Sequence, residues 1–227
     1  MPHLLILPGL DGTGTLHADF AAACAPAFST VHSIAYPPDQ CLGYEALTQL
    51  VRQQLPANAR FVLLAESFSG PIGMAIAASA PANLQGLVLS TSFASSPLPT
   101  LQAFAGLLRF APVRALPTSL IAPWLLGRWR NQALVAALDN ALHRVQPQVL
   151  QFRAMAAIRA PHAAPRIRCP MLYLRAQQDR VIPRSAADQL LPHYPQLHIV
   201  DLDGPHLLLQ TQPQQAADAV AHFARRL

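Results

Sequence analysis

The chain of 227 residues contains no lysine, only 11 acidic residues and only three cysteines. Cys24, Cys41 and Cys169 are widely separated, so they indicate neither a disulfide framework nor a metal motif of C-x-x-C type. Each is expected to be a small apolar side chain within the fold. The sequence therefore predicts a protein without disulfides and without a metal site.

Long apolar segments are also absent. No uninterrupted apolar run reaches the length of about 20 residues that a membrane-spanning helix needs. The N-terminus runs from Met1-Pro2-His3 directly into the apolar residues Leu4–Leu7, with no basic region before them. We therefore expect no transmembrane segment and no signal peptide, and a cytoplasmic location.

The positive charge of the chain is confined to one segment. Residues 67–178 contain ten arginines and the single acid Asp139, a net charge of +9, whereas the remaining residues are net acidic. A uniformly basic surface would favour a nucleic-acid partner. The confinement of the charge, and the lack of any recognised binding module, predict no nucleic-acid partner.

Short apolar runs alternate with helical patterns along most of the chain, which indicates βα units and a parallel sheet. The fold class predicted is α/β, a mostly parallel sheet of about six strands with helices on both faces. The predicted strands are Leu4–Leu7, His32–Tyr36, Phe61–Ala65, Leu87–Thr91, Met171–Arg175 and Leu197–Asp201.

The alternation stops at about residue 94 and resumes at about residue 169. The intervening sequence is rich in proline and has no clear strand. We therefore predict a core made of residues 1–93 and 169–227, with a helical cap inserted at 94–168. The helices predicted within the cap are Leu101–Phe110, Ser119–Arg128, Gln132–Arg144 and Pro147–Arg159.

Ser67 stands where the strand Phe61–Ala65 runs into a helix rich in small residues. This strand–turn–helix context is the one in which a nucleophilic serine is held exposed on a tight turn. Gly70 and Gly73 would let the helix pack closely on the sheet. The alternative is that Ser67 only caps the helix N-terminus.

A serine nucleophile needs a base, and the base needs an orienting acid. Asp179 follows the strand Met171–Arg175, and His206 follows the last strand, so both lie at the carboxyl edge of the sheet, where ligands bind. The alternative for Asp179 is a surface ion pair with Arg180. We predict that Ser67, Asp179 and His206 form a catalytic triad.

The glycine-rich loop Pro8–Gly14 follows the first strand. It could hold a phosphate, but it lacks the lysine of a P-loop and the spacing of a dinucleotide motif. We prefer the interpretation that the loop forms part of an oxyanion hole, in which the N–H groups of Leu10 and Phe68 are the two donors. Asp11 is then expected to turn away from the site and bind loop amides.

In these stretches, which are Leu4–Gly14, Val62–Gly70, and Pro170–Pro183 with Leu202–Pro213, the chain resembles the α/β-hydrolase superfamily. The resemblance implies the order Ser, Asp, His and places a lid or cap where the insertion falls. Three residues differ from the usual pattern: Ala65 and Ser69 stand where the family usually has glycine, and Pro8 stands where many relatives have histidine.

The resemblance also implies that the usual first strand pair is absent, which leaves His32–Tyr36 as an edge strand. Exposed edges invite pairing. We therefore expect either a homodimer contact or a covering segment at this edge.

The predicted function is hydrolysis of carboxylic esters through an acyl-enzyme, with no cofactor. Acyl-thioesterase and acyltransferase activities use the same triad and stay open, as does a non-catalytic binding protein. The apolar residues of the cap predict an acyl pocket, and its arginines predict a docking surface for an acidic carrier protein. In this respect the chain is distantly similar to the pimeloyl-carrier-protein methyl ester esterases. The substrate expected is a small-molecule or carrier-bound acyl ester.

Overall fold

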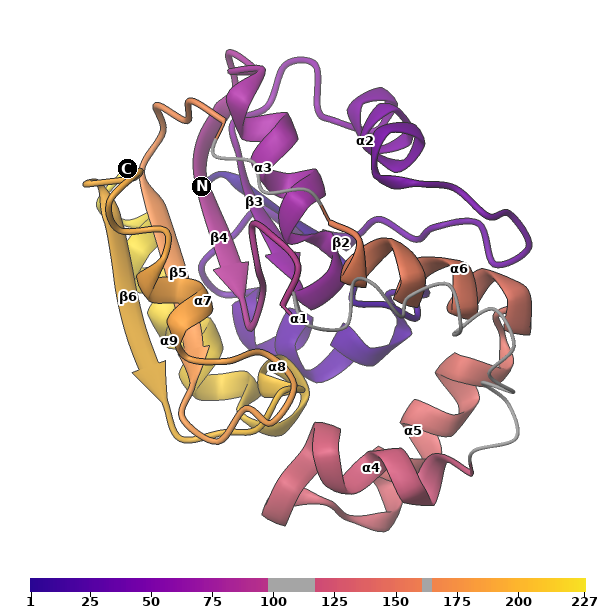
Figure 1. Cartoon of the computed structure of the whole chain (residues 1–227). Helices are drawn as coiled ribbons and strands as arrows, with labels where there is room; N and C mark the ends of the chain where they lie inside the picture. Colours follow the sequence, from indigo (N-terminus) through magenta and orange to yellow (C-terminus); the bar gives the residue numbers. More distant parts are fainter. Residues whose placement is uncertain (98–116, 161–164) are drawn as a thin grey trace.

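The computed structural model describes residues 1–97, 117–160 and 165–227 (Figure 1). The predicted helix Leu101–Phe110 lies outside the described residues. Within the described part, no helix is both long and apolar enough to cross a membrane.

Six parallel strands form one sheet, which confirms the predicted fold class. The sheet order is β2-β1-β3-β4-β5-β6, so β2 and β6 are its edges. Leu, Ile and Val dominate the central strands, which are buried on both faces, as is usual for a parallel sheet between two helical layers. The strands are β1 (His3–Leu7), β2 (Thr30–Ser33), β3 (Phe61–Glu66), β4 (Leu84–Ser90), β5 (Met171–Ala176) and β6 (Leu197–Leu202).

The second strand differs from its predicted range of His32–Tyr36. β2 pairs with β1 from Thr30 to Ser33, and the amide of Ile34 still donates to Ile6. The amide of Tyr36 donates instead to the carbonyl of Gly12, at 2.7 Å, so the chain has left the sheet there. Ile34 and Tyr36 are nevertheless buried. Their apolar side chains therefore indicated burial within the fold, and not pairing in a strand.

Two apolar clusters, one on each face, attach helices to the sheet (Figure 1). Alternate residues of β3 divide between them: Leu63 packs with the helices of one face and Leu64 with those of the other. One layer comprises α2 (Tyr44–Gln53), α3 (Gly70–Ala78) and α7 (Ser185–Asp188), and the other comprises α1 (Ala18–Cys24), α8 (Leu208–Thr211) and α9 (Pro213–Ala224).

Among the described residues between β4 and β5 there are three α-helices: α4 (Thr118–Leu126), α5 (Gln132–His143) and α6 (Pro147–Ile158). We call them the helical segment. Asn131 caps the N-terminus of α5, because its side chain accepts a hydrogen bond from the amide of Leu134. Pro147 is the first residue of α6. Figure 1 shows α4 and α5 extending from the body of the molecule, with α6 closer to it. The division into core and cap stays a prediction.

Candidate active site

Ser67 begins a single turn of 3-10 helix, η2 (Ser67–Ser69), between β3 and α3. Its φ of 46° lies in the left-handed region, which is uncommon for a residue with a side chain. Ser92 Oγ donates to the carbonyl of Ser67 at 2.5 Å and holds this strained turn. Because the N-cap of α3 is Ser69, the alternative in which Ser67 caps the helix does not apply.

His206 and Asp179 come together with Ser67 at the carboxyl edge of the sheet. Ser67 Oγ lies 2.9 Å from Nε2 of His206, and Nδ1 of His206 lies 2.9 Å from Oδ2 of Asp179. The amides of Val181 and Ile182 donate to Oδ1 of Asp179 at 2.7 and 2.9 Å. The side chains of His206 and Asp179 are only 5% and 4% exposed, so the Asp179 carboxylate is held by fixed donors rather than by water.

Two other acids, Asp201 and Asp203, closely precede His206 in the sequence, and both bind arginines instead. Arg175 binds Asp201 through two hydrogen bonds of 2.8 Å, and Arg128 donates to Asp203 at 2.5 Å. The surface pair of Asp179 with Arg180 is not formed, because the carboxylate of Asp179 faces His206. The guanidinium of Arg180 instead lies 3.5 Å from the carbonyl of Pro123.

The loop after β1 lies against the turn that carries Ser67. A Cβ atom placed on Gly9 would lie 3.9 Å from Cβ of Ser67, which shows how closely the loop approaches. The hydroxyl of Ser69 donates to the carbonyl of Pro8, and it lies 2.6 Å from the hydroxyl of Tyr36. Ser69 in place of glycine therefore ties the loop to the turn, a bond that glycine could not make.

Asp11 behaves only partly as expected. Its carboxylate accepts the amide of Thr13 at 2.8 Å, as predicted for a loop carboxylate. It does not turn away from the site, however, because Asp11 also lines the cavity above Ser67.

Arg153 of α6 is the largest fully buried side chain in the described residues. Its Nη1 donates to the carbonyls of Leu10 and Asp11 at 3.2 and 2.7 Å, and its Nη2 donates to the carbonyl of Pro37 at 2.9 Å. Burial lowers the pKa of this guanidinium, and the charge of Asp11 opposes that effect. Arg153 is therefore buried within the fold and cannot be part of an exposed docking surface.

A second buried polar group lies directly beside Ser67 and was not identified from the sequence. Glu66 accepts a hydrogen bond of 3.0 Å from Gln210 and lies 2.9 Å from Nε2 of His17. Burial by itself would raise the pKa of Glu66, but His17 and Gln210 outweigh it and the pKa falls below its usual value. Burial would likewise lower the pKa of His17, yet Glu66 outweighs it and the pKa rises. Residues so far apart in sequence gave no local signal of this pairing.

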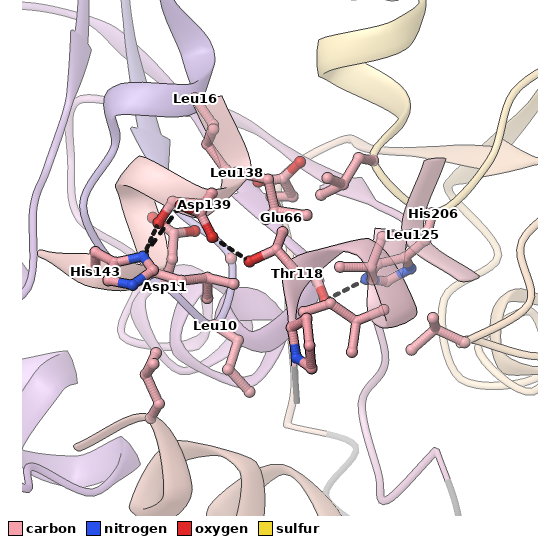
Figure 2. A pocket seen from close by; sticks show the side chains of 18 residues that line it. Leu10, Asp11, Leu16, Glu66, Thr118, Leu125, Leu138, Asp139, His143 and His206 are labelled. Atoms are coloured by element: carbon pink, nitrogen blue, oxygen red, sulfur yellow. Dashed lines mark hydrogen bonds and ion pairs between the residues drawn. The ribbon is translucent and has the colours of Figure 1, made fainter. Parts of the chain in front are cut away.

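A cavity of about 440 Å³ opens above Ser67 and His206, between the sheet edge and the helical segment (Figure 2). Most of its wall is apolar, and among the described residues that line it none is an arginine. The apolar residues of the wall are Leu10, Leu16, Pro117, Ile121, Leu125, Leu138, Leu142, Leu150, Val181 and Leu207.

The helical segment also contributes a polar group to this cavity. Asp139 accepts a hydrogen bond of 2.5 Å from Thr118, and its carboxylate lies 3.3 Å from Nδ1 of His143 (Figure 2). Among the described residues, no cluster of three or more His, Cys, Asp or Glu side chains could hold a metal ion.

The family model described as serine aminopeptidase, S33 (Hydrolase_4), matches residues 40–203 of this chain. The chain belongs to this family. It is therefore an α/β-hydrolase, and the resemblance found in its motifs is confirmed. The match spans β3 with Ser67 and β5 with Asp179, and it ends three residues before His206.

One curated relative of this α/β-hydrolase is the biotin biosynthesis bifunctional protein BioHC of Cellvibrio japonicus. The two are 31% identical over 203 residues, which is 88% of this chain and 34% of that protein. The chain thus spans about a third of the length of the curated relative it matches.

Solved structures share the fold at low sequence identity. An esterase from Thermogutta terrifontis superposes with a TM-score of 0.81 at 20% identity, covering 100% of this chain and 90% of the other. An enol-lactonase from Burkholderia xenovorans gives 0.79 at 18% identity, covering 99% and 91%. An esterase from Exiguobacterium antarcticum gives 0.82 at 12% identity, covering 99% and 92%. At these identities the likeness establishes the α/β-hydrolase fold.

Proposed function

We propose that this α/β-hydrolase cleaves carboxylic esters by acyl-enzyme chemistry. The observation that carries the proposal is the chain of short contacts from Ser67 through His206 to Asp179 at the floor of an apolar cavity. A serine hydroxyl is a weak nucleophile unless an adjacent base takes its proton, and this geometry supplies that base and its orienting acid.

In the first half-reaction, Ser67 Oγ forms a bond to the ester carbonyl carbon while its proton passes to Nε2 of His206. The tetrahedral intermediate then expels the alcohol, which takes that proton from His206. In the second half-reaction, water gives a proton to His206 and attacks the acyl carbon, and Ser67 leaves with the proton restored. Asp179 holds His206 with Nε2 free to accept, because Nδ1–H donates to its carboxylate.

The negative charge on the carbonyl oxygen needs fixed N–H donors. We assign this role to the amides of Leu10 and Phe68. Support comes from the loop geometry: the carbonyl of Gly9 accepts the amide of Gly12 at 3.1 Å, and Leu10 lines the cavity.

The lining of the cavity supports an uncharged, mostly aliphatic acyl chain. The carboxylate residues among its described lining, Asp11, Glu66 and Asp139, disfavour a chain that ends in a carboxylate. We expect kcat/KM for p-nitrophenyl esters to rise with acyl length and to fall when the chain ends in a carboxylate. A flat response to length would contradict a role of the helical segment in measuring the acyl chain.

Ser67→Ala tests the nucleophile. The variant should lose ester hydrolysis by at least about 10³-fold and should no longer be labelled by a fluorophosphonate, while it still binds the ester. Ser79→Ala, at the exposed end of α3, is the matched control and should keep full activity. Undiminished turnover by Ser67→Ala would refute the assignment. Absence of labelling in the native protein would favour a non-catalytic binding protein.

A second candidate is a carrier-bound acyl ester or thioester, processed by the same triad. Two observations favour it: the relative named as a biotin biosynthesis protein, and the exposed arginines that flank the helices of the helical segment. These exposed residues are Arg128, Arg130, Arg144 and Arg159.

Salt separates this candidate from a free small-molecule ester. Contacts between exposed charges weaken as ionic strength rises. For a methyl ester on an acidic acyl carrier protein, kcat/KM should therefore fall with salt and with Arg130→Ala plus Arg144→Ala. For the free ester neither change should matter. Equal responses of the two substrates would contradict docking of a carrier at these arginines.

A further inference from the structure

The guanidinium of Arg153 makes all its hydrogen bonds to backbone carbonyls. The three acceptors belong to Leu10, Asp11 and Pro37, and within the described part of the chain its Nε has no hydrogen-bond partner. A buried cation is costly unless it is well hydrogen-bonded. Two of its three hydrogen-bond acceptors, the carbonyls of Leu10 and Asp11, belong to the loop after β1. Arg153 therefore restricts the conformation of that loop.

The bonds of Arg153 limit how the peptide planes of residues 9–12 can turn. In a trans peptide the C=O and the following N–H point in opposite directions. The carbonyl of Gly9 points to the amide of Gly12, so the N–H of Leu10, in the same peptide plane, points out of the turn. Arg153 holds the next two carbonyls, so neither of those peptides can flip without breaking a bond to the guanidinium.

The contact is close and leaves little freedom. A Cβ atom on Gly12, whose φ is 71°, would lie 2.3 Å from Nη1 of Arg153. The centre of the Tyr36 ring lies 5.6 Å from Cζ of Arg153, and the hydroxyl of Tyr36 lies 2.6 Å from that of Ser69, on the turn that carries Ser67. The arginine on α6 is thus connected to both halves of the proposed site, the loop and the serine turn.

We propose that Arg153 is a positioning residue that sets the direction of the Leu10 N–H, and so couples α6 of the helical segment to the oxyanion hole. This inference rests on the ester-hydrolase function proposed above. A lysine cannot replace the arginine, because its single ammonium group cannot span the three carbonyls that the planar guanidinium reaches. Displacement of α6 should lower the rate of the chemical step rather than the binding of the ester.

The test compares Arg153→Lys and Arg153→Met with the native protein after titration of active sites by a fluorophosphonate. For Arg153→Lys, kcat per titrated site on p-nitrophenyl butyrate should fall by about 100-fold, the scale of a misplaced oxyanion donor, with KM nearly unchanged. The affinity for a trifluoromethyl ketone should fall by a similar factor, because its adduct with Ser67 carries the same oxyanion. Arg52→Lys, exposed in the last turn of α2 and assigned no role in the site, is the matched control.

A purely structural role gives a different result. It would lower the melting temperature and the number of titratable sites, but it would leave kcat per site and the ketone affinity at their native values. That outcome in Arg153→Lys would overturn the inference, and it would do so even if Arg153→Met failed to fold. The proposed function would stand in that case, since it is tested separately, by Ser67→Ala and by fluorophosphonate labelling of the native protein.

Discussion

Single buried polar residues define the environment of Ser67. Glu66, His17 and Gln210 form a hydrogen-bonded group that is nearly inaccessible to solvent and lies next to the nucleophile position. Buried charges persist when they are paired and hydrogen-bonded, and removal of one partner leaves the other uncompensated. The stability of the site should therefore depend on the protonation of this group.

We predict a pH-dependent loss of stability in His17→Gln. The folded pKa of Glu66 is lowered, so its contribution is present above its usual pKa of 4.5 and is lost as pH falls through the folded pKa. The folded pKa of His17 is raised, so its contribution is present below 6.5 and is lost as pH rises through the folded pKa. The pair therefore contributes fully between those two values.

Unfolding measured by denaturant between pH 4 and 9 checks this prediction. His17→Gln should lower the free energy of unfolding by about 2 kcal/mol in the window between the two usual pKa values, and by less at higher pH. His222→Gln, on the exposed face of α9, should show no such window. A loss of equal size at every pH would contradict the ion pair.

At the scale of elements, the close packing of α3 against the sheet places Ser67. A Cβ atom on Gly73 would lie 2.7 Å from Cβ of Ala65, which confirms the predicted need for small residues there. A Cβ atom on Gly70 would lie 2.0 Å from Oγ of Ser92 and 2.7 Å from the carbonyl of Phe93. Ser92 in turn holds the carbonyl of Ser67, so the start of α3 and the serine turn are one packed unit.

Gly70→Ala should therefore damage both stability and activity. The added methyl group pushes α3 away from the end of β4, at a cost of about 1 to 3 kcal/mol, and displaces Ser92 from the turn. Thermal unfolding and kcat on a p-nitrophenyl ester measure the two effects. Gly43→Ala, at the start of α2 where the added atom meets nothing within 4 Å, is the control. Native-like kcat in Gly70→Ala would argue against the coupling of the helix to the turn.

At the scale of the whole molecule, β2 is an edge of the sheet, as the resemblance implied. Thr30 and His32 are exposed on it, and the strand pairs with β1 on its other side. Unpaired edges attract a further strand unless they are protected. A dimer contact or a covering segment at β2 stays a prediction.

Light scattering and hydrogen exchange together test whether the β2 edge is covered. We expect either the mass of two chains or slow exchange of the β2 amides in a monomer. If a dimer forms, Thr30→Lys with His32→Lys should dissociate it, because charges on an edge oppose pairing. A monomer whose β2 amides exchange rapidly would contradict both forms of the prediction.

Much of this architecture was predictable because it is encoded locally. Apolar runs of strand length gave the six strands, and the order Ser67, Asp179, His206 at strand ends gave three residues that the structure brings together. The apolar pattern failed to predict strand pairing at Ile34 and Tyr36, which are buried without belonging to a strand.

The sequence by itself determined the α/β fold and the residues of the proposed triad, because alternation of elements and strand-end positions are properties of neighbouring residues. Tertiary structure alone decided that Arg153 is buried against the loop at Leu10 and that His17 pairs with Glu66. These contacts join segments 143 and 49 residues apart. No local pattern specifies them, since a buried charge becomes tolerable only after distant carbonyls and carboxylates have been brought to it.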